Sequence, residues 1–432
     1  MARHTATGPK LLLADPKGTV VEHPYLLATL RSGQDLLPAD DREAIPMPEA
    51  AKLAHLPGRL PVGINPESGE LELVREFTVG RKTFVPHAVG ALLPPGYTRT
   101  YLPGELKADG PVLPQWAYTA AAWSEKGPIV WALHTDKRKH WSPSDYSTPE
   151  LKSLVDGHQA RFPESRVLKQ LRTCSLLYRC FTSQNIFYVR DEGAIPASTM
   201  CNAQCVGCIS EQPAEGPPSS HKRMDDGPTA QDMGEVGLYH LQHATGRTMV
   251  SFGQGCEGEP LTRWKFIAEA IRYMREHTDR GSININTNAS LTKGLEALFD
   301  AGLDSIRVSL NSAVKELYEA YYKPVKYGWE DVEASIALSR KRGAYLALNL
   351  LLFPGVTDRE GEVEALIQLI RKYKVDQVQT RSLCIDPIQY NDVAEGKGAG
   401  GEPIGVRNML REFKRAAPWL VIGNFARGLD ER

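Results

Sequence analysis

Between about residues 190 and 385, the sequence alternates short apolar stretches with longer amphipathic ones. The amphipathic stretches repeat apolar residues at helical spacing, as Leu366 and Ile370 do, and Thr357 and Glu360 ahead of them have the spacing of a helix capping box. Six stretches predict strands: 194–196, 249–253, 282–287, 305–311, 345–353 and 375–382. Strands that alternate with helices are typical of a parallel sheet, so the pattern predicts an α/β fold.

The predicted strands carry polar residues at every second position. In one of them, Ser305, Arg307, Ser309 and Asn311 alternate with apolar residues, and other strands show the same alternation. Parallel strands buried on both faces are continuously apolar instead. We therefore expect a partial (βα)6 barrel of the TIM type, with helices on the apolar side and a polar cavity inside. The alternative is a closed core in which these polar side chains hydrogen-bond to one another.

Three cysteines lie within eight residues, directly after the first predicted strand. They are Cys201, Cys205 and Cys208, with the spacing C-x3-C-x2-C. Three thiolates can hold three irons of a four-iron cluster, which leaves the fourth iron open to a small molecule. A closed structural metal site would need a fourth ligand nearby. Because active sites of α/β barrels lie at the carboxyl ends of the strands, we expect the motif to open onto the polar cavity.

The composition argues against several classes of protein. The chain of 432 residues is 42% hydrophobic and has a formal net charge of −1, so nucleic-acid binding is not indicated. No apolar run reaches the length of a membrane span, and the start of the chain lacks a signal-peptide pattern. Seven cysteines, an odd number, argue against a secreted disulfide framework. We expect a cytoplasmic protein with no membrane partner.

Changes in pattern along the chain predict four segments. Residues 1–165 are rich in proline and glycine and predict an N-terminal accessory domain of mostly β or irregular structure, whose role the sequence does not indicate. Residues 166–190 predict a helical linker, residues 191–385 the partial barrel, and residues 386–432 a short C-terminal extension.

Taken with its place after the first strand, the cysteine motif resembles that of the radical S-adenosylmethionine (SAM) superfamily. The segment from Gly253 to Leu261 resembles the Gly-Gly-Glu-Pro segment of this family, whose backbone meets the SAM amino group, with Glu257 in place of the first glycine. The third strand ends like the family's Thr-Asn-Gly segment. The fourth ends where the family contacts the SAM ribose or carboxylate, and the fifth ends in a glycine-containing segment like the one beside the adenine. The cofactor-binding residues implied by this resemblance are Gly255, Glu257, Gly258, Glu259, Asn286, Asn288, Ser309, Asn311 and Gly355.

The resemblance implies an enzyme with a 4Fe-4S cluster on the catalytic residues Cys201, Cys205 and Cys208, and with SAM as second cofactor. In the family, the cluster cleaves SAM reductively to a 5'-deoxyadenosyl radical, which abstracts hydrogen from a substrate. The substrate here is unidentified, and a reductant such as flavodoxin or ferredoxin is implied. One departure is Gly207, which stands where the family usually has an aromatic residue near the adenine.

Three further residues have roles that the sequence leaves open. Arg307 and Arg381 are expected on the cavity side, where they bind an anionic group of SAM or substrate, or else pair with internal carboxylates. Cys384, just past the sixth strand, donates a hydrogen atom, becomes methylated or is a buried spectator. Two alternative functions therefore stand beside the first. They are a radical SAM methylase of RNA or protein that uses Cys384, and a non-enzymatic iron–sulfur or zinc-binding protein.

Overall fold

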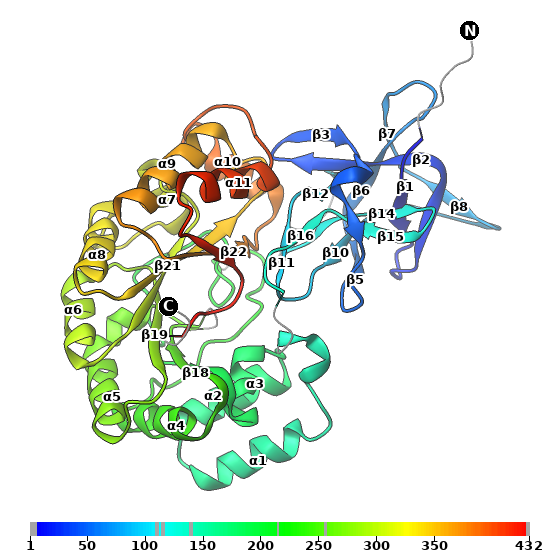
Figure 1. The fold of residues 1–432 in the computed structure, drawn as a ribbon. Helices are drawn as coiled ribbons and strands as arrows, with labels where there is room; N and C mark the ends of the chain where they lie inside the picture. The colour runs from blue at the N-terminus through cyan, green and yellow to red at the C-terminus, as the bar shows by residue number, and fades with distance from the viewer. Residues whose placement is uncertain are drawn as a thin grey trace.

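Two regions of different architecture lie side by side in the computed structural model (Figure 1). The structure describes residues 7–108, 112–113, 117–137, 141–213, 216–254 and 257–428. Strands with short 3-10 helices, such as Asp41–Glu43, build the N-terminal region, whereas strands and α-helices alternate in the second region, and three α-helices among the described residues lie between the two along the chain. Among the described residues, none of the helices combines the length and the apolar character needed to cross a bilayer.

The N-terminal region is dominated by one large antiparallel sheet. The strands of this region, within that sheet and outside it, are β1 Lys10–Ala14, β2 Val20–Ser32, β3 Asp35–Pro38, β4 Ile45–Pro46, β5 Lys52–Leu56, β6 Arg59–Ile64, β7 Leu71–Leu73, β8 Phe77–Val79, β9 Lys82–Phe84, β10 His87–Leu92, β11 Tyr97–Arg99, β12 Leu102–Pro103, β13 Glu105–Lys107, β14 Thr119–Ser124, β15 Gly127–Val130 and β16 Ala132–His134. The main sheet follows the order β13-β6-β2-β1-β10-β14-β15-β4, while β8 pairs with β9 and β11 with β16. Trp131, which is fully buried, fills the core of this region.

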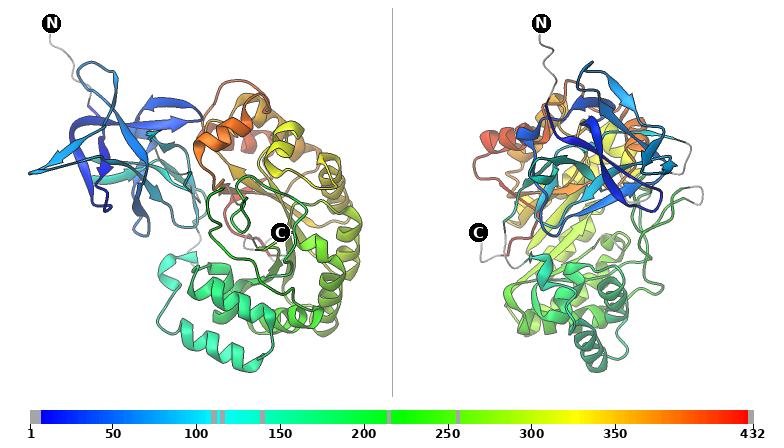
Figure 2. Two further views of the ribbon diagram at one scale, coloured as in Figure 1. Left: turned by 180° about the vertical axis from the view of Figure 1, so that it is seen from behind. Right: turned by 90° about the vertical axis from the view of Figure 1, so that its right-hand side faces the viewer.

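The second region is a curled parallel sheet with helices on its outside, which confirms the predicted α/β class. Its strands, in spatial order, are β17 Arg190–Ile195, β18 Thr245–Phe252, β19 Ser282–Thr287, β20 Ser305–Leu310, β21 Tyr345–Leu352, β22 Gln377–Ser382 and β23 Val421–Gly423. The helices are α1 Leu151–Arg161, α2 Arg166–Leu176, α3 Phe181–Tyr188, α4 Ala230–His243, α5 Trp264–His277, α6 Thr292–Ala301, α7 Lys315–Tyr322, α8 Trp329–Lys341, α9 Glu360–Lys372, α10 Pro387–Ala394 and α11 Val406–Ala416. Figures 1 and 2 show helices α4 to α9 as an arc around the convex side of the sheet.

The alternating polarity of the strands sorts their side chains onto the two sides of this sheet. Ile283, Ile285, Ile306 and Val308 are fully buried in one large core with the apolar faces of the helices. Burial of such side chains contributes about 25 cal/mol for each Å² removed from water, which favours this curved packing. The polar residues between them are left on the concave side.

On that concave side, part of the polar surface forms a closed network. Ser251 donates a hydrogen bond to Glu192 at 2.6 Å, and the Arg307 guanidinium donates to Ser251 at 3.0 Å and pairs with the Glu192 carboxylate. Asn284 hydrogen-bonds to Ser251 at 3.1 Å and to Ser305 at 2.9 Å. Polar side chains on the concave side therefore hydrogen-bond to one another, and Glu192 and Arg307 of this network also line the cavity at the strand ends.

Charged groups join the N-terminal region to the α/β region. Arg59 and Asp386 form a fully buried ion pair, and Glu105 lies 3.8 Å from Arg59 and 3.6 Å from Arg31. The Arg99 guanidinium donates to the Leu383 carbonyl at 2.8 Å. Removing one member of such a buried pair leaves the other charge uncompensated, so these groups hold the two regions in one relative position.

Backbone contacts complete this junction at a glycine pair. The Gly33 N–H donates to the Pro354 carbonyl at 2.9 Å, and a Cβ atom on Gly355 would lie 1.8 Å from the Gly33 nitrogen. Gly355 also has a φ of +86°, which favours glycine. Only glycine fits here.

The predicted capping box at Thr357 is wrong. Helix α9 begins at Glu360, and its N-cap residue Arg359 makes no side-chain cap. The Thr357 hydroxyl accepts the Phe353 N–H at 3.0 Å, and the Asp358 carboxylate accepts the Gly355 N–H at 2.6 Å. Both side chains stabilise the tight turn that presents Gly355 to the N-terminal region, so neither caps the helix.

We predict that Gly355→Ala destabilises the protein more than Gly343→Ala. Both glycines have positive φ, +86° and +70°, so both substitutions incur a backbone penalty of about 1–2 kcal/mol. Only at Gly355 does the new methyl group meet the backbone of another segment, whereas Gly343 has nothing within 4 Å. Such overpacking costs a further amount of about 1–3 kcal/mol. Thermal unfolding midpoints of the two variants test this. Equal midpoints would contradict the contact.

Candidate active site

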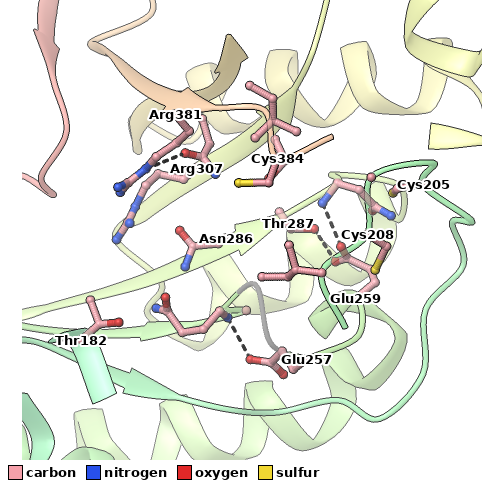
Figure 3. A pocket seen from close by; sticks show the side chains of 18 of the residues that line it. Thr182, Cys205, Cys208, Glu257, Glu259, Asn286, Thr287, Arg307, Arg381 and Cys384 are labelled. Atoms are coloured by element: carbon pink, nitrogen blue, oxygen red, sulfur yellow. Dashed lines mark hydrogen bonds between the residues drawn. The ribbon is translucent and has the colours of Figure 1, made fainter. Parts of the chain in front are cut away.

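A cavity of about 740 Å³ lies at the carboxyl ends of the parallel strands. Its walls come from the cysteine loop after β17, the loops after β18 and β19, the ends of β20 to β22, and the segment that follows β23 (Figure 3). A volume of this size is ample for a cofactor-sized molecule together with a small second one.

All three cysteines of the motif line this cavity, namely Cys201, Cys205 and Cys208. Their loop is fastened to the end of α7, because the Gln204 and Val206 N–H groups donate to the Tyr322 and Tyr321 carbonyls, each at 3.0 Å. The loop therefore has a defined path before any metal binds.

The electrostatics of these thiols respond to one another. Burial raises the pKa of Cys201 and carries the pKa of Cys205 well above its ordinary value, and the neighbouring thiols add to the rise in both. Neighbouring thiolates repel one another, which raises their pKa, and a single cationic group bound between them would stabilise the thiolate forms.

The donor set suits an iron–sulfur cluster, because three cysteine thiols line one cavity. Among the described residues, no three His, Cys, Asp or Glu side chains converge as one bound ion requires. Ligands of a tetrahedral zinc at about 2.3 Å would lie about 3.8 Å from one another. In a 4Fe-4S cluster each cysteine binds a different iron, so the thiolates stand further apart.

The loop after β18 is bound to the segment that precedes Cys201. The Gly258 N–H donates to the Ser198 carbonyl at 2.9 Å, and the Glu259 N–H donates to the Met200 carbonyl at 2.8 Å. A Cβ atom on Gly258 would lie 1.9 Å from the Met200 oxygen. The glycine is therefore required for the close approach of the two backbones.

Two buried glutamates hold the same loops through their carboxylates. Glu257 accepts N–H groups from Ala197 at 2.5 Å, Ser198 at 2.7 Å and Gln254 at 2.9 Å. Each contact joins the loop after β18 to the strand end before the cysteines, or closes the loop on itself. Glu257 therefore fixes the conformation of the loop after β18 and its position beside the end of β17.

Glu259 connects this loop to the loop after β19. Its carboxylate accepts the Leu261 N–H at 2.9 Å, the Asn288 N–H at 2.8 Å and the Thr287 hydroxyl. The Asn288 amide then donates to the Asn202 side chain at 2.9 Å, within the cysteine loop. Three loops that are distant in sequence are therefore one hydrogen-bonded unit.

The structure brings most of the predicted cofactor residues to the cavity. Those that line it are Glu257, Gly258, Glu259, Asn286, Asn288 and Ser309. Asn311 is not among the lining residues, since it is fully buried and its amide donates to the Leu317 carbonyl at 3.3 Å and to the Tyr390 hydroxyl at 3.2 Å. Gly355 is also absent from the lining and lies instead against Gly33. Gly255 lies outside the described residues.

An aromatic residue that the motif reading missed stands next to Gly207. A Cβ atom on Gly207 would lie 3.0 Å from the Tyr321 hydroxyl, and Tyr321 is 3% exposed and lines the cavity. The tyrosine comes from α7, so the space beside this glycine is filled from another element. Nothing in the sequence around Tyr321 marks it, because its spacing is that of an ordinary helix.

The two cavity arginines differ in their partners. Arg307 pairs with the Glu192 carboxylate. Arg381 donates to Asn349 at 3.3 Å and to Gln379 at 3.0 Å, and no carboxylate among the described residues forms an ion pair with it. Internal pairing therefore holds for the first arginine only. Cys384 also lines the cavity, and burial raises the pKa of its thiol.

We predict a pH dependence of stability that comes from Glu259. Burial raises the pKa of this carboxyl to about 7, against the opposing effect of its N–H and hydroxyl donors. The folded chain therefore holds a proton that the unfolded chain releases near pH 4.5. This stabilisation is fully present below about pH 4.5 and is lost as the pH rises through about 7.

Thermal unfolding of the metal-free protein between pH 5 and pH 8 tests this expectation. The Glu259→Gln variant, which cannot ionise, loses less stability than the wild type as the pH rises. The exposed substitution Glu67→Gln serves as control and leaves the wild-type slope unchanged. Parallel curves for wild type and Glu259→Gln would contradict the raised pKa.

Residues 195–370 match the family model described as the radical SAM superfamily. A probable GTP 3',8-cyclase from Methanocaldococcus jannaschii is 25% identical over 234 residues, which are 51% of this chain and 70% of that protein. A GTP 3',8-cyclase from Limosilactobacillus fermentum is 27% identical over 204 residues, 46% of this chain and 54% of that protein. A solved radical SAM methyltransferase from Sphaerobacter thermophilus is 18% identical, with a TM-score of 0.38, over 56% of this chain and 68% of that one.

The matched residues 195–370 include the three cavity cysteines and the loops that hold them. The chain spans between about half and about two thirds of the length of the curated relatives it matches. Residues 195–370 of this chain are therefore a radical SAM domain, and enzymes of that superfamily use a 4Fe-4S cluster and S-adenosylmethionine.

Proposed function

We propose that Cys201, Cys205 and Cys208 hold the cluster, and that the enzyme uses a 5'-deoxyadenosyl radical to abstract hydrogen from a substrate bound in the same cavity. The observation that carries this proposal is the shared cavity. The three motif thiols and the loops of the family motif line one space of about 740 Å³.

When bound, the cluster would pass one electron from an external reductant to the sulfonium of SAM, so that cleavage of a carbon–sulfur bond would give methionine and the 5'-deoxyadenosyl radical. The residues of the chain do the rest. Glu257 and Glu259 are positioning residues, since their carboxylates are engaged with backbone N–H groups and fix the loop that meets SAM. Gly258 lets this loop reach the cysteine segment, and Asn286 and Ser309 present polar groups to the cavity. Tyr321 supplies the aromatic surface that Gly207 lacks.

The protein environment also limits side reactions of a radical. Walls from seven strand ends and their loops surround the cavity, which reduces the access of water and of other hydrogen donors. Cys384 also lines this cavity, and a thiol gives up a hydrogen atom to a radical readily. The roles of hydrogen donor and of methylated residue therefore both remain for it.

The wider organisation follows from the same proposal. We infer a partial (βα)6 barrel over residues 191–385 as the catalytic unit, an accessory domain over 1–165, a helical linker over 166–190 and an extension over 386–432. The N-terminal region would help recognise the substrate or a partner. A flavodoxin or ferredoxin is the proposed reductant, and a reducing cytoplasm suits thiols that must stay free for the cluster.

The cyclase activity of the relatives is not assigned to this chain. Those proteins are named as GTP 3',8-cyclases, and this chain covers 54% of one and 70% of another. Their similarity supports the shared cofactor chemistry, and the substrate of this chain is a separate question. The alternative of a non-enzymatic iron–sulfur or zinc protein is not retained, because the family consists of enzymes. The methylase alternative depends on Cys384.

We predict that the anaerobically reconstituted protein converts SAM to 5'-deoxyadenosine when dithionite is added. Cys208→Ala abolishes this product, since the variant lacks one of the three cluster ligands. Mass spectrometry of the nucleoside products is the measurement, with the exposed variant Arg272→Gln as control. A fully loaded protein that leaves SAM intact would refute the proposal, and S-adenosylhomocysteine as main product would favour the methylase.

A second prediction concerns the loop contact at Gly258. Gly258→Ala forces the loop away from Met200 and so moves the segment that leads into Cys201. We expect the iron content of the variant to fall far below the value of about four per protein for a full cluster. Gly157→Ala is a matched control, because this glycine lies exposed on α1 with nothing within 4 Å. Iron content after reconstitution is measured. Wild-type iron in the Gly258→Ala variant would show that the contact does not position the cysteines.

A further inference from the structure

We propose that Arg381 forms an anion site at the end of the cavity far from the cysteines, and that this site binds a carboxylate or phosphate group of the substrate. The inference rests on the proposed function, because it names the chemical class of the molecule that shares the cavity with SAM. Four features of the cavity support it: its charge balance, the orientation of Arg381, the place of Arg381 relative to the cysteines, and the aromatic wall beside it.

The charged side chains that line the cavity leave a positive excess. The Glu192 carboxylate is paired with Arg307, and Arg223 is paired with Glu211. Arg381 and Arg179 line the cavity too, and neither forms an ion pair within the described part of the chain. The two remaining lining carboxylates, Glu257 and Glu259, are held by the N–H and hydroxyl donors described above. An anionic ligand would balance this excess.

The guanidinium of Arg381 is held in a fixed orientation by uncharged partners. Its Nε donates to the side-chain oxygen Oδ1 of Asn349 at 3.3 Å, and one Nη donates to the side-chain oxygen Oε1 of Gln379 at 3.0 Å. Gln379 is fully buried, so this support is rigid. A guanidinium has five N–H donors in a planar fork, and these two contacts leave the others for a ligand. Neutral supports keep the full charge available, as bidentate recognition of an oxyanion requires.

Its location separates Arg381 from the SAM carboxylate. In Figure 3, Arg381 and Arg307 lie at one end of the site and Cys205 and Cys208 at the other, with Asn286 and Cys384 between them. A SAM molecule that binds the cluster through its amino and carboxylate groups has that carboxylate at the cysteine end. The anion recognised by Arg381 therefore belongs to the second molecule.

An aromatic wall beside Arg381 adds to this description of the ligand. The rings of Trp141 and Phe425 stack with their centroids 4.8 Å apart, and both residues line the cavity together with Phe181. The wall adjoins the strand that carries Arg381, because the neighbouring Asn424 amide donates to the Thr380 carbonyl at 2.7 Å. Rings next to a guanidinium suit a molecule that joins an anionic group to a flat or apolar body.

Anion binding to the SAM-bound holoenzyme tests the site. Isothermal titration at constant ionic strength would use inorganic phosphate in one arm and benzoate in the other, so that the two sources of anionic oxygen are told apart. We expect at least one probe to bind the wild type, and its dissociation constant to rise by a factor of ten or more, roughly one lost charge-assisted contact, in Arg381→Gln. Arg381→Lys, which keeps the charge and loses the fork, gives an intermediate value.

Controls separate the site from general effects of charge and folding. Arg272→Gln removes the same charge from the exposed face of α5 and leaves the affinity unchanged. Thermal unfolding midpoints show whether the Arg381 variants are folded. If Arg381→Gln does not fold, the affinity of Arg381→Lys decides the test. The proposal is overturned if neither probe binds in an Arg381-dependent way, or if Arg381→Gln weakens SAM binding by the same factor. Failure to form 5'-deoxyadenosine would instead count against the proposed function, because anion binding is read without turnover.

Discussion

The backbone hydrogen bonds accepted by two buried glutamates are the constraint on which the rest of the site depends. Glu257 and Glu259 take N–H groups from three loops that leave neighbouring strands, and so fix the edge of the sheet from which the cysteines project. Burying a carboxylate is costly unless donors surround it, and these loops provide them. Burial raises the pKa of both groups to about 7, so its effect outweighs that of the surrounding donors.

Much of the α/β region could be predicted from the sequence because its signals are local. The alternation of polar and apolar residues defined the strands, and β19 begins and ends where the pattern placed it, at Ser282 and Thr287. The same alternation predicted a polar interior, yet it did not say where that interior is solvated. Ser251 and Arg307 meet Glu192 in a hydrogen-bonded network, and Arg307 and Glu192 of this network also line the cavity, so the alternation alone does not separate buried from cavity-facing polar side chains.

Contacts between distant segments explain what sequence reasoning missed. Gly355 was expected near the adenine, but its close approach is to Gly33, which a local motif does not reveal. Thr357 had the spacing of a helix cap and serves a turn instead, because the turn must hold Gly355 in place. Tyr321 enters the site from a helix without any motif of its own. The two similar arginines differ because of the carboxylates that the fold brings within reach, and none in the described part of the chain forms an ion pair with Arg381.

The central claim is that three protein thiolates leave one iron of the cluster for SAM. Mössbauer spectroscopy of the protein reconstituted with the iron-57 isotope, recorded with and without SAM, tests this most directly. The claim predicts that one iron site differs from the others and that its signal alone shifts when SAM is added. Four irons that respond identically, or a spectrum that SAM does not change, would contradict it.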